Sequence, residues 1–262
     1  MGETIRRNLQ ETVRYLPLLR ELIKRDFKMK YKRTYLGILW TLLDPLLHMM
    51  VILIVFSQLI GRNIQYFAAY VMTGRLMVQF FSQASGYCVN SFVGGGLYIK
   101  SVKMPLYMLP LSKTISALIN KGIAMIILVF IIFFTGIELR PMMLLFPIPV
   151  LYAFLFSYGI GLAFGTWMVF FRDVGHLHGV LTTLLHFLTP TFYSVDIIPP
   201  NYQWIINSNP IYHFATMMRN LVMYGNMPTL TDHMICAMFC AGALIMGIAA
   251  FQKGKNTFIM HL

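Results

Sequence analysis

Few residues in this chain have the types and spacing that catalysis or metal binding needs. The phosphate-binding pattern G-x-x-x-x-G-K-S/T is missing, because Gly254-Lys255 is followed by Asn256, so the chain cannot hydrolyse ATP in the P-loop manner. No G-x-S-x-G nucleophile elbow and no H-E-x-x-H zinc motif occurs. His176 and His178 make a poor metal site, since a helix turns residues two positions apart to different faces. We expect no enzyme activity, cofactor or metal on this chain.

Ionisable residues inside apolar segments are the remaining candidates for chemistry. Asp44, Arg75 and Lys121 lie in such segments. Lys121 is near one end of its segment, where a long side chain can reach the membrane interface. Two interpretations of Arg75 stay open: its side chain reaches the opposite interface in the same way, or it faces a polar pathway.

Membrane-spanning helices must carry these residues. A mean hydropathy of +0.67, with 58% hydrophobic and 11% charged residues, is too apolar for a soluble protein of 262 residues. A spanning helix needs about 20 apolar residues. We expect an all-α integral membrane protein with a transmembrane domain over 35–251 and six spans, at about 35–60, 66–93, 113–137, 141–171, 174–195 and 233–251. The three cysteines lie in apolar runs and are expected to be buried hydrophobic residues.

The segment before the last span has a different pattern. Residues 196–230 are apolar but interrupted by Pro199, Pro200, Pro210 and Pro228. Such a segment is too broken for one straight spanning helix and too hydrophobic for a solvated loop. We therefore expect short re-entrant helices over about 196–223, because irregular backbone is tolerated inside a membrane where protein or water covers it.

Positive charge indicates the orientation. Ten of the first 33 residues are Lys or Arg and four are acidic. Segments 1–34, 95–113, 172–176 and 252–262 together hold 16 of the 21 Lys and Arg residues, whereas the connections on the other side hold three. This asymmetry predicts that both termini, including the tail 252–262, lie in the cytoplasm. Because the charge lies beside apolar segments, it indicates contact with membrane lipid and no nucleic acid binding.

Two cytoplasmic segments have patterns typical of short helices. Between Leu16 and Tyr31, apolar residues recur at helical spacing opposite a basic face, which predicts an amphipathic interface helix within 1–34. A topology signal with no further role is the alternative. The connection 94–105 begins with three glycines, continues as an amphipathic stretch and stops at Pro105. A short helix presented to a partner and a plain interfacial loop both fit this connection.

Several runs occur in an order that is specific when taken together. They are Lys24 to Trp40 followed by Asp44-Pro45-Leu46, Leu97-Tyr98-Ile99-Lys100 through Met104-Pro105 to Leu109-Pro110-Leu111, Phe171-Arg172-Asp173, Thr189-Pro190-Thr191-Phe192-Tyr193, Ile198-Pro199, Asn209-Pro210, and Arg219 before Gly225. These runs resemble the membrane subunits, or permeases, of type-2 ABC exporters for cell-surface polysaccharides such as O-antigen, wall teichoic acid and capsule. The resemblance covers nearly the whole chain.

The resemblance implies partners and a location. A permease of this family pairs with a second copy of itself to form a channel, and two copies of a separate ABC subunit carry ATP and Mg beneath it. The implied substrate is a polysaccharide on an undecaprenyl lipid carrier. The implied location is the bacterial cytoplasmic (inner) membrane, crossed several times.

The resemblance also implies which residues contact the ATPase and which form the channel. The family's coupling helix would lie at about 96–105 and, with the amphipathic helix and the second cytoplasmic loop, would contact the ATPase. The candidates for this contact are Arg25, Asp26, Lys28, Tyr31, Tyr98, Lys100, Lys103, Pro105, Arg172 and Asp173. Candidates for the channel or its outer gate are Tyr35, Trp40, Arg75, Phe80, Phe81, Tyr87, Pro190, Tyr193, Pro199, Asn209, Pro210 and Arg219. Packing is the alternative role for any aromatic residue in a span.

Other function classes fit the sequence less well. An ABC exporter permease for a drug or another lipid is the alternative within the family. An ion-coupled secondary carrier should keep paired carboxylates inside its spans, yet Asp44 is the only acidic residue well within one. A membrane enzyme should cluster Asp, Glu or His at one interface, and here they are scattered. Arg75 departs from the family's apolar pattern and would favour an anionic polymer if it faces the channel.

Overall fold

The computed structural model describes residues 15–32, 34–57, 64–96 and 104–258, and each regular element within these ranges is a helix. The longer helices are α2 (Leu16–Tyr31), α3 (Trp40–Phe56), α4 (Phe67–Val89), α7 (Met108–Thr135), α8 (Pro147–Phe170), α9 (Val174–Leu188), α11 (Pro210–Arg219) and α12 (Leu230–Gly254). The shorter ones are η1 (Gly37–Leu39), α5 (Ser91–Gly94), η3 (Pro141–Leu145), η4 (Val195–Ile197), η5 (Pro200–Tyr202), α10 (Gln203–Asn207) and the π-helical turn η6 (Asn220–Tyr224). The all-α class is confirmed.

Four of the described helical stretches are long and apolar enough to cross a membrane. They are Gly37–Phe56, Met108–Thr135, Pro141–Phe170 and Leu230–Gly254. α9 is a shorter apolar helix, and α4 has the length of a span but is less apolar. These helices lie close to the segments expected from the sequence, while the count of six spans stays a prediction.

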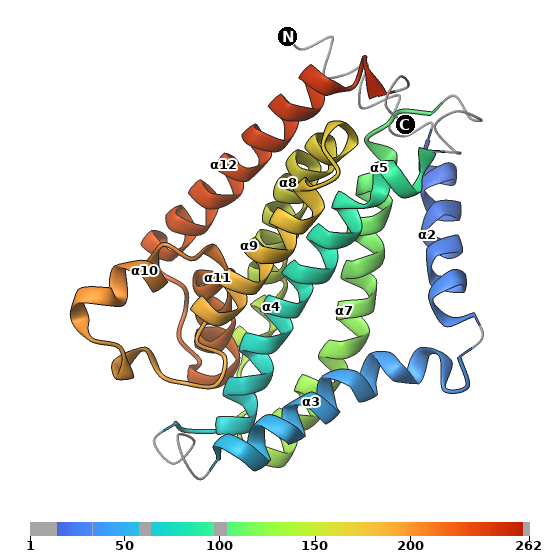
Figure 1. Ribbon diagram of the computed structural model, residues 1–262. Coiled ribbons are helices and arrows are strands. Elements are labelled where there is room, and N and C mark those ends of the chain that lie inside the picture. Colours follow the sequence, from blue (N-terminus) through green and yellow to red (C-terminus); the bar gives the residue numbers. More distant parts are fainter. Residues whose placement is uncertain (1–14, 33, 58–63, 97–103, 259–262) are drawn as a thin grey trace.

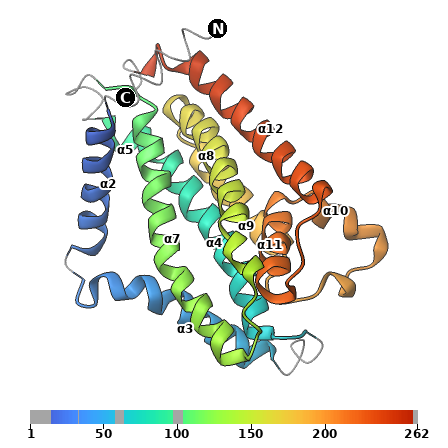
Figure 2. The ribbon, with the colours of Figure 1, turned by 180° about the vertical axis from the view of Figure 1, so that it is seen from behind.

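α4 forms the centre of the helix bundle (Figure 1). It packs against α7, α8 and α11, and most of its side chains are buried. α3 runs across the lower end of α4 and α7, and α2 runs alongside α7 (Figures 1 and 2). The start of α2 and the end of α12 lie at the same end of the bundle, as expected if both termini share one side.

α8 and α12 pack closely, and small residues make the contact possible. A Cβ atom on Gly159 would lie 2.5 Å from the backbone carbonyl carbon of Ala243, and one on Gly247 would overlap Gly159. Gly242, also on α12, has nothing within 4 Å of the same position. Membrane helices use small residues in this way because close backbone approach maximises van der Waals contact.

The segment between α9 and α12 folds back on the bundle. α11 packs on α4 and α8, and Phe214 is fully buried among them. Asn209 caps α11 by accepting a hydrogen bond from the Ile211 amide at 3.0 Å, and Pro210 occupies the first turn. The proline-interrupted stretch expected at 196–223 therefore consists of short helices, of which α11 belongs to the core.

Candidate functional site

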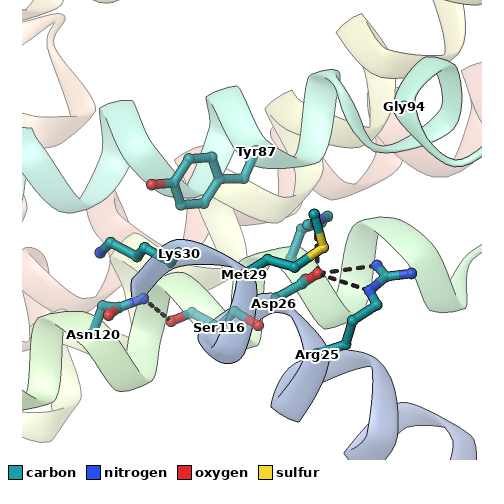
Figure 3. Close-up of a pocket in the computed structure, with 9 residues that line it drawn as sticks. Arg25, Asp26, Met29, Lys30, Tyr87, Gly94, Ser116 and Asn120 are labelled. Carbon is teal, nitrogen blue, oxygen red and sulfur yellow. Dashed lines mark hydrogen bonds and ion pairs between the residues drawn. The ribbon is translucent and has the colours of Figure 1, made fainter. Parts of the chain in front are cut away.

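A polar crevice between α2, α3, α4 and α7 is the candidate functional site. Its upper part is a cavity of about 440 Å³ bordered by α2, α4 and α7, and its lower part is a cavity of about 300 Å³ that extends to α3. Lys30, Tyr87 and Asn120 border both cavities, so the two are adjacent. Figure 3 shows Tyr87 on α4 facing Met29 and Lys30 on α2 across the upper part.

An ion cluster fastens α2 to α7 at the upper end of the crevice. Asp26 Oδ1 accepts hydrogen bonds from Lys113 Nζ at 2.8 Å and from Arg25 Nη2 at 3.0 Å (Figure 3 draws the Arg25 bond). The Asp26 side chain is only 9% exposed, and its second oxygen has no hydrogen-bond partner among the described residues. A carboxylate this buried needs its cations, so the cluster fixes the register of α2 on α7.

The ion pair on the outward face of α2 differs from the Asp26 cluster because it is exposed to solvent. Lys24 pairs with Glu21 at 2.7 Å on the exposed face of the helix. The hydrogen bond from Lys24 lowers the pKa of the Glu21 carboxyl. Such an exposed pair contributes little to the position of a helix.

Tyr31 joins the end of α2 to both α7 and α3. Its hydroxyl donates to Asn120 Oδ1 at 2.6 Å and also contacts Thr41 Oγ1 at 2.7 Å. Asn120 is held in place because its amide donates to the Ser116 carbonyl at 2.8 Å. Three helices are therefore connected through one phenol group, and a shift of α2 must act on the start of α3.

A second polar chain crosses the lower part of the crevice. Lys121 on α7 donates to Gln79 Oε1 on α4 at 3.0 Å, and Gln79 donates to Asp44 Oδ2 on α3 at 2.9 Å. Lys121 is 3% exposed, so it does not reach the interface as the sequence suggested. Arg75 is half-buried on α4, and its Nε has no hydrogen-bond partner among the described residues. Lys121 shows how a buried ionisable group persists when a neighbouring helix supplies a hydrogen-bond partner.

The crevice carries an excess of positive charge. Arg25, Lys30, Lys113 and Lys121 border it, against the carboxylates Asp26 and Asp44. Its wall also contains hydrogen-bonding groups such as Gln83 and Ser116. The arrangement suits an anionic group.

A separate cluster surrounds Arg219 on the other side of α4. The buried guanidinium donates to the Pro190 carbonyl at 2.6 Å and lies 3.6 Å from the centre of the Tyr70 ring. Tyr70 in turn donates to the Tyr193 carbonyl at 2.8 Å. Asn209 donates to Thr189 Oγ1 at 2.8 Å. Several residues expected at the outer gate thus form one group that ties α4 to the segment after α9.

The other candidate residues fall into different environments. Tyr98, Lys100, Lys103 and most of the expected coupling helix lie outside the described residues. Arg172 and Asp173 are exposed in the turn between α8 and α9, and Lys28, Tyr35, Trp40 and Pro199 are exposed too. Pro105 is half-buried before α7. Phe80 and Phe81 are fully buried in the core, where Phe81 contacts Phe156 with ring centres 5.5 Å apart.

Sequence reasoning did not include several residues of the crevice. Lys113 and Asn120 are seven residues apart, which places them on one face of α7, and Ser116 lies between them on that face. This heptad spacing of polar residues on an apolar helix is the signal that could have identified them. Gln79 on α4 lies four residues after Arg75 and gives the same kind of signal.

Comparison with known proteins gives a consistent result. Residues 17–223 match the family model described as "ABC-2 type transporter". The O-antigen export system permease protein RfbA of Klebsiella pneumoniae is 28% identical over 246 residues, covering 92% of this chain and 93% of that protein. RfbA of Myxococcus xanthus is 26% identical, covering 96% and 98%. The polysialic acid transport protein KpsM of Escherichia coli is 23% identical, covering 91% and 93%.

Proposed function

Because the chain belongs to the ABC-2 type transporter family, we propose that it is the channel-forming permease subunit of an ATP-driven exporter of polysaccharide. The observation that carries this proposal is the match over more than 90% of both chains to permeases named for O-antigen and polysialic acid export. We place the chain in the bacterial cytoplasmic membrane as a multi-pass protein with both termini in the cytoplasm.

The proposed assembly contains two copies of this chain and two copies of a separate ATP-binding ABC subunit, which holds ATP and Mg. The substrate is a polysaccharide of the O-antigen, teichoic acid or capsule type, linked to undecaprenyl lipid. The charge of the polar crevice supports a lipid-linked substrate, because a phosphate group between carrier and sugar is an anion that the crevice complements.

The contacts of α2 suggest how ATPase closure reaches the spans. Asp26 and Tyr31 face α7 and α3 within the chain, while Lys28 on the same helix is exposed. In this proposal the ATPase acts on the exposed face of α2 and on the loop before α7. The buried face then transfers the displacement to Thr41 at the start of α3 and to Asn120 on α7.

A reconstitution experiment tests the proposal. The chain is purified with and without its ABC subunit, placed in vesicles, and supplied with lipid-linked polysaccharide on the outer, cytoplasm-like side. We expect transfer of polymer into the vesicle only with the ABC subunit and ATP. Full transport by the chain alone would refute the role of a permease driven by a separate ATPase.

A further inference from the structure

A second cavity lies at the end of the bundle opposite the start of α2 and the end of α12. It has a volume of about 300 Å³ and lies between the start of α4, the end of α7 and the π-helical turn Asn220–Tyr224. Gln65, Tyr66, Glu138, Arg140 and Tyr224 border it. We call it the outer pocket, and it shares no bordering residue with the polar crevice.

Unusual backbone conformations meet at the outer pocket. Tyr66 has a φ of 52° and is the only non-glycine residue with positive φ in the described ranges. Gly136 borders the pocket with a φ of 71°, and Gly225, with a φ of 66°, lies against the Arg140 side chain. A bulky residue in the left-handed region costs about 1–3 kcal/mol and persists where the surrounding structure enforces it, which is commonest at functional sites. π-Helical turns have the same association.

Hydrogen bonds link the polar groups of the outer pocket. Arg140 Nη1 donates to the Tyr224 carbonyl at 2.9 Å, and Nη2 donates to Glu138 Oε2 at 3.0 Å. This pairing leaves no net charge on the two side chains. Their remaining groups, with the Gln65 amide, offer both donors and acceptors, and the lining of the pocket is mainly polar.

This combination of groups fits a neutral sugar. A sugar ring presents hydroxyl groups that both donate and accept hydrogen bonds, and a mainly polar lining with donors and acceptors complements them. The cavity is at the small end of the range for ligand pockets, about 300–1,000 Å³, which suits one residue better than a long chain. We propose that the outer pocket binds a single neutral sugar residue. That this residue belongs to the exported polymer rests on the proposed function.

Saturation-transfer NMR on the purified chain tests this site. The protein is kept in a detergent without a sugar head group and mixed with millimolar methyl glycosides of glucose, galactose, mannose and N-acetylglucosamine. We expect saturation transfer to at least one glycoside. Glu138→Ala changes an exposed side chain, so this variant should stay folded. Tyr66→Gly removes a side chain that also packs partly against the core, and glycine accepts the positive φ without strain, so its fold is checked by circular dichroism. Each should lower the signal at least fivefold.

Tyr202→Ala is the matched control, because Tyr202 is an exposed aromatic in η5 that does not border the outer pocket. Its signal should equal that of the unmodified chain. A folded chain that shows no saturation transfer, or a signal that Tyr66→Gly and Glu138→Ala leave unchanged, would overturn the site. This assay needs no ATPase, so it is independent of vesicle transport. Transport without sugar binding would refute only the sugar site in the outer pocket. Sugar binding without transport would refute only the proposed transport function.

Discussion

The Asp26 ion cluster gives the sharpest prediction. Asp26→Asn keeps the shape of the side chain but removes the charge that Lys113 and Arg25 contact at 2.8 and 3.0 Å. A hydrogen bond to a charged group contributes about 1.5–3 kcal/mol. Both cations keep partial access to solvent, and Asn can still accept one bond, so we expect a loss of about 2 kcal/mol in the free energy that holds α2 on α7. That loss corresponds to about a 30-fold increase in opening.

Thiol labelling can measure this opening. Leu22, on the buried face of α2, is 5% exposed, and the three native cysteines are buried, so Leu22→Cys reacts only when α2 moves away from the bundle. If α2 closes faster than it is labelled, the labelling rate follows the opening equilibrium. Adding Asp26→Asn to Leu22→Cys should raise the rate about 30-fold. Lys113→Gln should raise the labelling rate less than Asp26→Asn does. Because Asp26 and Lys113 contact each other, the free-energy change of the variant with both substitutions should be smaller than the sum of the two single changes.

Glu21→Gln is the matched control for this prediction. It removes a carboxylate from the same helix, but Glu21 pairs with Lys24 on the exposed face. We expect no change in the labelling of Leu22→Cys. If Asp26→Asn labels no faster than Glu21→Gln, the buried cluster does not hold α2 in place, and the argument for transmission through α2 fails.

Three further predictions concern other contacts. Tyr31→Phe removes both hydroxyl contacts, which contribute about 1 kcal/mol each. We expect the amount of polymer transported per ATP hydrolysed to fall severalfold while ATP hydrolysis continues. An unchanged ratio of transport to hydrolysis would contradict this prediction. Arg219→Lys cannot keep the planar contact with Tyr70 and should lower stability by about 2 kcal/mol in thermal unfolding, whereas an unaltered midpoint would argue against it. Gly159→Ala should cost about 1–3 kcal/mol by the same measurement, and Gly242→Ala should be neutral; equal effects would refute the packing argument.

The sequence predicted the helical membrane class and most helix positions because long apolar runs leave few alternatives. The expected spans 113–137 and 233–251 correspond to Met108–Thr135 and Leu230–Gly254. Ends were less predictable: α7 begins at Met108, five residues before the expected span, and α12 extends at both ends into polar residues whose backbone bonds continue the helix. The capping box of Thr229 and Asp232 sets the start of α12, which the hydropathy pattern did not reveal.

Side-chain environment was the part that one sequence could not determine. Phe80 and Phe81 look alike to a hydropathy pattern whether they face a channel or a core, and here both are in the core. Lys121 lies near the end of a span, yet a neighbouring helix supplies Gln79 at hydrogen-bonding distance and keeps it buried. Such pairings depend on which helices are adjacent, and adjacency is a property of the tertiary fold.

The polarity of α4 has a consequence for how the protein is made. α4 carries Arg75, Gln79 and Gln83 and falls short of the apolarity of the four spanning stretches. An arginine near the middle of a helix opposes entry into the lipid by about 2.5–3.5 kcal/mol during synthesis. Asp44 precedes α4 in the chain and Lys121 follows it. One hydrogen-bond partner of Gln79 is therefore synthesised before α4 and the other after it. α4 should therefore leave the translocation machinery together with α3 and α7, as one folded group of helices.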